Sequence, residues 1–481
     1  MERKAGVLMH VSSLPGKYGI GSLGKAAYEF VDFLAAAGLS LWQVLPLCPT
    51  SYGDSPYQSP SVFAGNPYFI DLDALIDAGL LCRGEVREYR LGSVDYAALY
   101  AERYDTLRIA FGRFIASPQA GYAEFKAKHG GVWLDDYALF MAIKEANGMR
   151  AWESWADEYK YRTADMNAFA DAAEFYKFLQ YEFYTQWQSL KAYANGRGVS
   201  IIGDMPIYVA YDSVDVWSNP RQFMLDADLS RKTVAGVPPD YFSATGQLWG
   251  NPLYDWEYMA ERGYDWWIAR MRNAFDMYDV VRIDHFRAFA DYYSIPAGRD
   301  DACVGEWLAG PGKKFFDAVE AALGKKSIIA EDLGELHDCV RELVAAVGFP
   351  GMKVLQFAFD GNPHNEFLYT NYPENCVAYT GTHDNDTTRG WFDALDENGK
   401  ATVRRTIGYE GNAIAKTLVQ RLFASNADTV IVPMQDLLNA PTSARMNIPS
   451  TTGGNWLWRS QDKWTAKAAS IRKLVEKTKR I

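Results

Sequence analysis

Short apolar segments recur along the chain, and most are followed by a polar stretch rich in glycine, proline or aspartate and then by residues with helical spacing. Eight of these segments are rich in valine, isoleucine and leucine, as parallel strands buried on both faces are. They cover residues 6–12, 41–47, 199–205, 280–284, 327–331, 352–359, 377–382 and 429–434. Eight such units predict an α/β fold, a closed (β/α)8 TIM barrel, with an open doubly wound sheet as the alternative.

Two gaps between the predicted strands are too long for a single connection. Residues 73–196 contain one proline and have aromatic residues at helical spacing, which predicts a helical insertion subdomain. Residues 207–278 form the second gap, and within it residues 235–252 are rich in glycine and proline, as a long active-site loop is. We therefore expect one catalytic barrel over residues 1–481 with these two insertions.

Charge and composition exclude several classes of function. The net charge is −11 and no cluster of Lys or Arg stands out, which argues against a nucleic-acid partner. No phosphate-binding glycine motif follows a predicted strand, which weakens nucleotide binding. The five cysteines are scattered, as in a reducing compartment, and neither a signal peptide nor a membrane span is apparent. We expect a cytoplasmic protein with no membrane partner, no metal and no cofactor.

Carboxylates stand at the ends of four predicted strands: Asp204, Asp284, Glu331 and Asp384. Since the carboxyl ends of barrel strands meet at one mouth, these side chains should converge there. No metal-ligand spacing accompanies them. The chain also has 15 Trp, 30 Tyr and 25 Phe, which either line a sugar site or fill a large core. Acidic groups with aromatic walls favour glycoside chemistry.

Two of these carboxylates have neighbours that suit opposite roles. Arg282 and Asp284 share one face of a strand, so the cation should lower the pKa of Asp284, as a nucleophile requires, although a structural ion pair has the same pattern. Glu331 follows three apolar residues, so burial should raise its pKa, as a general acid requires; a carboxylate bound to backbone amides is the alternative. Asp384 lies in a polar run that suits sugar hydroxyls and lacks the spacing of a calcium loop.

Seven motifs then occur in order: HVSSLPG, GDSPYQSPS-x-FAGNP, GDMPIYV, SATGQLWGNPLY, RIDHFR, AEDLG and GTHDN. With them the chain resembles the amylomaltases, or 4-α-glucanotransferases, of the α-amylase clan, from residue 6 to residue 459. The resemblance implies a transferase that moves segments of α-1,4-glucan to the 4-hydroxyl of an acceptor glucan or glucose by retaining double displacement. Its substrates would be maltooligosaccharides and the dextrins of starch or glycogen.

The resemblance also implies a role for each motif residue. Asp284 matches the catalytic nucleophile, Glu331 the general acid/base and Asp384 the carboxylate that stabilises the transition state. The residues that match substrate contacts are Arg282, His285, His383, Asp204, Ser55, Tyr57, Asp240, Gln247 and Trp249. Two positions depart from the family pattern, because Ala288 and Ala244 stand where many members have glycine and glutamate.

Three other functions fit parts of this pattern. An amylase-type hydrolase of α-1,4-glucan is the nearest, since both reactions use the same scaffold and differ only in whether water or a sugar accepts the glucosyl group. A non-catalytic glucan-binding barrel has no need of a matched nucleophile and acid. A metal-dependent barrel hydrolase is more distant, because the carboxylates lack metal-ligand spacing.

Overall fold

The computed structural model describes residues 3–89, 92–239, 243–334, 336–461 and 464–480. Eight parallel strands form one sheet in the order β10–β11–β12–β1–β2–β3–β6–β9. Their bounds are β1 (Lys4–Leu8), β2 (Leu41–Gln43), β3 (Ser200–Pro206), β6 (Val280–Asp284), β9 (Ile328–Ala330), β10 (Gly351–Val354), β11 (Cys376–Tyr379) and β12 (Thr429–Pro433). The Ala330 N–H donates to the Pro350 carbonyl at 3.0 Å and joins the first and last strands of this order. The predicted (β/α)8 barrel is confirmed.

All eight predicted apolar segments overlap a barrel strand, but several strands end earlier than predicted. The segment 352–359 leaves the sheet at Val354, and Leu355–Ala358 forms a 3-10 helix. Residues 11–13 likewise form a 3-10 turn after β1. Both turns are largely buried, and apolar composition alone does not separate a buried strand from a buried turn.

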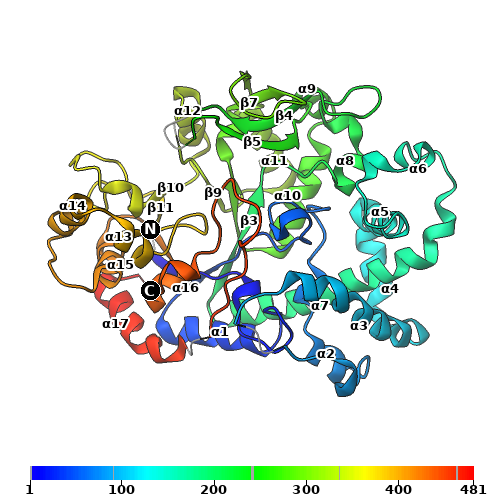
Figure 1. Ribbon diagram of the computed structural model, residues 1–481, viewed down its shortest axis with the longest axis horizontal. Coiled ribbons are helices and arrows are strands. Elements are labelled where there is room, and N and C mark those ends of the chain that lie inside the picture. The colour runs from blue at the N-terminus through cyan, green and yellow to red at the C-terminus, as the bar shows by residue number, and fades with distance from the viewer. Residues whose placement is uncertain (1–2, 90–91, 240–242, 335, 462–463, 481) are drawn as a thin grey trace.

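Helices surround the strands (Figure 1). Between β2 and β3 lie α2 (Leu72–Asp77), α3 (Tyr96–Ala116), α4 (Ala120–His129), α5 (Asp135–Ala146), α6 (Asp157–Lys160) and α7 (Ala170–Gly196). The others are α1 (Lys25–Ala37), α8 (Val214–Ser218), α9 (Trp256–Glu261), α10 (Asp265–Met277), α11 (Lys313–Leu323), α12 (Asp338–Val347), α13 (Thr388–Ala394), α14 (Glu397–Ile407), α15 (Ile414–Ala424), α16 (Met434–Leu438) and α17 (Ala468–Thr478). None of the helices in the described part of the chain has the length and apolar character needed to cross a bilayer.

A second, antiparallel sheet lies beside the barrel, at the top of Figure 1. Its order is β5–β4–β7–β8, with bounds β4 (Thr233–Val237), β5 (Gln247–Pro252), β7 (Asp291–Pro296) and β8 (Glu306–Ala309). Both ends of the segment 235–252, predicted as a loop, are therefore paired strands, and residues 238–246 connect them. β4 pairs both with β5, inside the segment, and with β7, some sixty residues later. The glycine and proline content of the segment suggested a loop, and the long-range pairing with β7 leaves no local pattern.

Much of the aromatic content lies in the core and not on a binding surface. Trp42, Trp152, Trp187, Trp217 and Trp267 are among the largest fully buried side chains. Several of them donate their indole N–H to a backbone carbonyl; that of Trp42, for example, lies 2.8 Å from the Met9 oxygen. A buried tryptophan keeps its large apolar area without an unpaired polar atom in this way.

Candidate active site

Arg282 connects two of the predicted carboxylates at the end of adjacent strands. Asp204 on β3 is the register partner of Arg282 on β6. Arg282 Nη1 lies 2.7 Å from both carboxylate oxygens of Asp204, and Nη2 lies 2.9 Å from Asp284 Oδ1. The Arg282 and Asp204 side chains are 5% and 0% exposed, whereas that of Asp284 is 30% exposed. Arg282 and Asp204 thus form a buried support, and Asp284 remains accessible.

Glu331 lies next to this support, directly after β9. Its carboxylate accepts hydrogen bonds from two backbone N–H groups, that of His285 at 2.7 Å and that of Leu333 at 2.9 Å. Burial raises the pKa of Glu331 to about 7, and the nearby charge of Asp284 adds to the effect. Glu331 is therefore protonated in a large fraction of molecules at neutral pH, as predicted from its apolar strand.

The expectation that Arg282 lowers the pKa of Asp284 is wrong in its net direction. The contact exists, but burial raises the pKa of Asp284 and outweighs the opposing effect of Arg282. The charges of Asp204 and Asp384 also raise it, so these carboxylates lie close enough to act on one another. The charge of Asp284 in turn raises the pKa of Glu331, so the protonation of one carboxyl group affects the other.

Asp384 and His383 reach the same region from the end of β11. His383 Nε2 lies 3.4 Å from Asp384 Oδ1, and Asn447 donates its side-chain N–H to that oxygen at 2.6 Å. Arg445 donates to the backbone carbonyl of Asp384 at 2.6 Å. Sequence reasoning missed Asn447 and Arg445, since both follow α16 in a stretch without strand or motif pattern.

Tyr57, in the loop after β2, contacts both Asp204 and His383. Its hydroxyl donates to Asp204 Oδ2 at 2.8 Å, and its ring stacks on the His383 imidazole with centroids 5.1 Å apart. The Trp456 ring lies 5.9 Å from Tyr57. Ser55 acts on the loop itself, because its Oγ accepts from the Tyr57 backbone N–H at 3.2 Å.

The small sheet brings Trp249 to the other side of the site. The Trp249 ring meets the His285 imidazole edge to face, with centroids 4.7 Å apart, and its N–H donates to Gln247 Oε1 at 3.1 Å. Burial lowers the pKa of His285 to about 3, so this imidazole is neutral. His285 has φ of +53°, a conformation that costs energy in a non-glycine residue and is common at functional sites. Asp240 lies outside the described residues.

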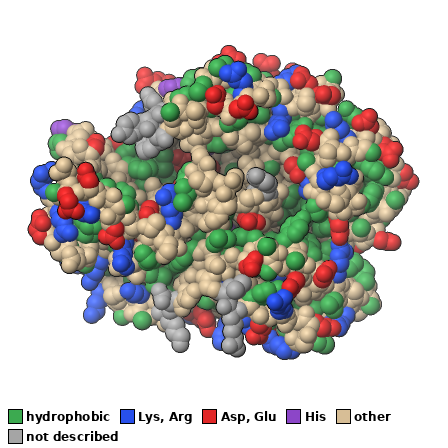
Figure 2. Space-filling view, viewed as in Figure 1, with side chains coloured by type: hydrophobic (Ala, Val, Ile, Leu, Met, Phe, Trp, Pro, Cys, Tyr) green, Lys and Arg blue, Asp and Glu red, His purple; other side chains and the backbone are tan. Residues whose placement is uncertain are grey.

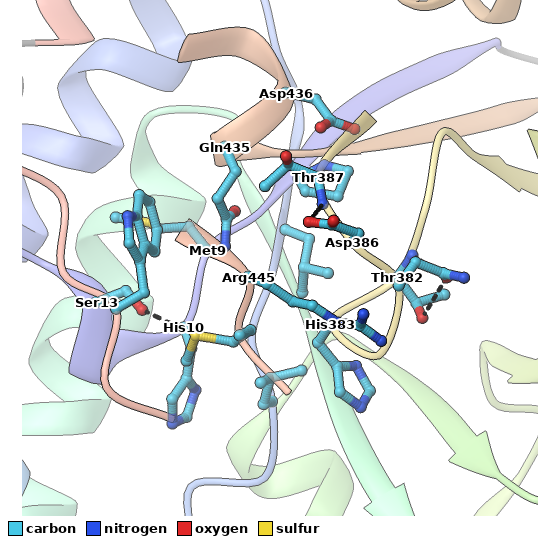
Figure 3. Close-up of a pocket in the computed structure, with 16 residues that line it drawn as sticks. Met9, His10, Ser13, Thr382, His383, Asp386, Thr387, Gln435, Asp436 and Arg445 are labelled. Carbon is cyan, nitrogen blue, oxygen red and sulfur yellow. Dashed lines mark hydrogen bonds between the residues drawn. The ribbon is translucent and has the colours of Figure 1, made fainter. Parts of the chain in front are cut away.

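A pocket opens beside His383, between the ends of β1, β11 and β12. Figure 3 shows Arg445 next to His383, with Asp386, Thr387 and Asp436 above them in the view. His10 also lines this pocket, and burial and the His383 charge lower its pKa to about 3. His10 was missed, although it follows β1 as the predicted carboxylates follow their strands.

In Figure 2 the centre of the visible face has few charged side chains, and most charges lie around the rim.

Partly exposed carboxylates at the mouth of the barrel, with aromatic rings beside them, are typical of barrel enzymes that act on glycosidic bonds, and this chain is of that class. The family described as 4-alpha-glucanotransferase matches residues 9–465, so the chain belongs to that family. The family predicted from the seven motifs is thus confirmed, and with it the activity of a 4-α-glucanotransferase.

Individual relatives agree with this assignment. A 4-alpha-glucanotransferase of Streptococcus pneumoniae is 49% identical over 95% of this chain and 93% of its own length. One of Clostridium butyricum is 46% identical over 94% and 96%. The structure of the amylomaltase from Streptococcus agalactiae in complex with acarbose matches with a TM-score of 0.96 and 41% identity, covering all of both chains. The amylomaltase from Corynebacterium glutamicum, at 18% identity and a TM-score of 0.80, shares the fold.

Proposed function

We propose that the chain transfers segments of α-1,4-glucan by a retaining double displacement, with Asp284 as nucleophile and Glu331 as general acid and base. The observation that supports these roles is the unequal surroundings of the two carboxylates. Asp284 contacts the Arg282 guanidinium, whereas Glu331 accepts from backbone N–H groups. When the pair shares one proton, the Arg282 cation favours the charge on Asp284, while burial raises the pKa of Glu331 to about 7 against the opposing effect of its two backbone bonds.

In the first step, Asp284 attacks the anomeric carbon while Glu331 gives its proton to the leaving glycosidic oxygen. The products are a glucosyl ester on Asp284 and a shortened glucan with a free 4-hydroxyl. In the second step, Glu331 takes the proton of an acceptor 4-hydroxyl, whose oxygen displaces Asp284 and restores the α-1,4 bond. Such a reaction places the two carboxyl groups about 5–5.5 Å apart, and an inverting one about 6.5–9.5 Å.

The other predicted residues have supporting roles in this proposal. Asp384 holds hydroxyls of the reacting sugar and stabilises its positive charge, while Asn447 and His383 orient Asp384. Tyr57 provides a ring for stacking, and its contact with Asp204 fixes that ring. The remaining substrate contacts are Arg282, His285, Ser55, Gln247, Trp249 and Asp240.

Transfer requires that a sugar and not water reaches the ester. We propose that the segment 235–249, which ends at Trp249, limits the access of water during the second step. In this organisation residues 73–196 are a helical insertion subdomain, and residues 207–278 are the second insertion of a single barrel. The substrates are maltooligosaccharides and the dextrins of starch or glycogen, with no nucleic-acid or membrane partner. The five free thiols suit a reducing cytoplasm.

Incubation with maltotriose tests the proposal directly. Transfer yields glucose together with a ladder of longer oligosaccharides, which chromatography resolves. Maltose and glucose alone would identify a hydrolase, and unchanged maltotriose would identify a binding protein. Asp284→Asn is the control, because it keeps the size of the side chain and removes the nucleophile.

A further inference from the structure

A histidine, a cysteine and an aspartate meet away from the proposed catalytic carboxylates. Asp291 is the first residue of β7, His337 is the N-cap of α12 and Cys339 lies in the first turn of that helix. The ligand atoms of all three lie within 4.8 Å of one another. Their side chains come from segments almost fifty residues apart, so the tertiary structure and not local sequence assembles the group.

The separation of Cys339 Sγ from Asp291 Oδ2 suits a tetrahedral metal ion, whereas His337 Nδ1, in direct contact with the same oxygen, has to move away from it when the ion binds. His337 Nδ1 contacts Asp291 Oδ2, and the Cys339 thiol donates to the same oxygen at 3.5 Å. A zinc ion about 2.0 Å from a carboxylate oxygen and about 2.3 Å from a thiolate sulfur holds these two atoms about 3.5 Å apart. The Sγ and Oδ2 atoms thus already have the spacing that coordination requires.

We propose that Asp291, His337 and Cys339 form a binding site for a borderline-soft divalent metal ion, with zinc as the preferred ion and water in the fourth position. Thiolate and imidazole together select such ions, whereas magnesium and calcium prefer oxygen ligands alone. His337 is 44% exposed and Cys339 is exposed, so an ion can enter from solvent. On binding, the Cys339 thiol loses its proton to solvent.

Arg287 binds only one of the two carboxylate oxygens of Asp291. Its Nε and Nη2 donate to Oδ1 at 3.2 and 2.8 Å, which leaves Oδ2 for the ion. Arg287 Nη2 also lies 3.3 Å from His337 Nδ1, and this positive charge weakens metal binding relative to a site without it.

The position of the site gives the ion a structural effect. Asp291 follows His285 by six residues, and His337 follows Leu333 by four. His285 and Leu333 provide the two backbone N–H groups that hold the Glu331 carboxylate. An ion between Asp291 and His337 therefore connects the two segments that position Glu331, without taking part in the reaction.

Titration of the full, reduced chain with cobalt(II) at neutral pH tests the site. We expect one ion per chain, a thiolate-to-cobalt charge-transfer absorption, displacement by zinc and a higher melting temperature with metal. Cys339→Ser should abolish the absorption and weaken cobalt binding more than about tenfold. Cys303→Ser is the matched control, since Cys303 is also exposed and lies beside an aspartate, Asp301.

A second pair of variants tests the imidazole. His337→Ala should weaken binding, and His364→Ala, which removes another exposed histidine, should not. The metal-free melting temperature of each variant verifies that it folds. An absorption that survives Cys339→Ser, or a reduced parent chain that binds no cobalt through sulfur, would overturn the proposal.

Discussion

Two groups of buried carboxylates lie at the ends of the barrel strands, and their surroundings differ in kind. Asp436, in the first turn of α16 after β12 and 4% exposed, accepts from the hydroxyls of Thr380 and Thr388 at 2.5 and 2.6 Å. The Thr388 backbone N–H donates to its other oxygen at 2.7 Å. Both oxygens are thus engaged inside the protein, and none is left for a ligand.

Asp284 is different because its side chain is 30% exposed and contacts a cation through one oxygen. Burial raises the pKa of both Asp436 and Asp284, so a raised pKa alone does not separate a structural carboxylate from a reactive one. What separates them is exposure, because Asp284 is accessible at the barrel mouth whereas Asp436 is enclosed by the protein. This contrast predicts that changes in the first group reduce stability and changes in the second reduce activity.

The largest effect should follow Asp284→Asn. Loss of the nucleophile should lower kcat for transfer from maltotriose by on the order of 10⁴-fold, which corresponds to an increase of about 5.5 kcal/mol in the activation free energy. Stability should change little, since the amide keeps the size of the carboxylate and needs less solvation. Product chromatography and thermal unfolding measure the two quantities, and an active variant would remove Asp284 from the mechanism.

Glu331→Gln should have the next largest effect, a loss of about 10²–10⁴-fold. In the parent chain the first step needs a protonated Glu331, so its rate should fall as pH rises through about 7. The pKa of Glu331 in the folded chain lies above the value of about 4.3 in the unfolded chain. Protonated Glu331 therefore contributes its full share to the free energy of unfolding below about pH 4.3, and this contribution is lost as pH rises through about 7. Unfolding of Glu331→Gln should therefore depend less on pH between 5 and 8.

Asp436→Asn tests the other group. An amide has a single oxygen, which cannot accept both from the Thr380 and Thr388 hydroxyls and from the Thr388 backbone N–H, so the free energy of unfolding should fall by about 2–3 kcal/mol. Chemical denaturation measures the fall. Transfer per folded molecule should stay near that of the parent chain; a loss as large as that of Glu331→Gln would contradict the contrast.

The smallest effect should follow Trp249→Ala. Without the ring beside His285, water should reach the ester more often, and the fraction of hydrolysis should rise several-fold. This change corresponds to about 1 kcal/mol in the difference between the activation free energies of transfer and hydrolysis. The ratio of glucose to longer oligosaccharides reports this partition. Trp249→Phe, which retains a ring, should remain close to the parent, and equal ratios in all three proteins would show that Trp249 does not control water.

Local pattern was sufficient for the eight barrel strands, and the seven motifs were sufficient for the family. A strand buried on both faces is apolar throughout, and a polar residue at its end is conspicuous in the printed sequence, which is how Asp204, Asp284 and Glu331 were found. His10 did not stand out in this way, because the predicted segment 6–12 continues past it, whereas β1 ends at Leu8. The catalytic and binding roles of these residues stay predictions.

Only the tertiary structure decided how these residues meet. Arg282 reaches Asp204 and Asp284 together because β3 and β6 are neighbours, and burial then outweighs that cation in setting the pKa of Asp284. Neither the pairing of β4 with β7 nor the meeting of Asp291 with His337 leaves a local trace. The physical reason is that strand pairing and desolvation depend on which distant segments come together, whereas strand character depends on adjacent residues.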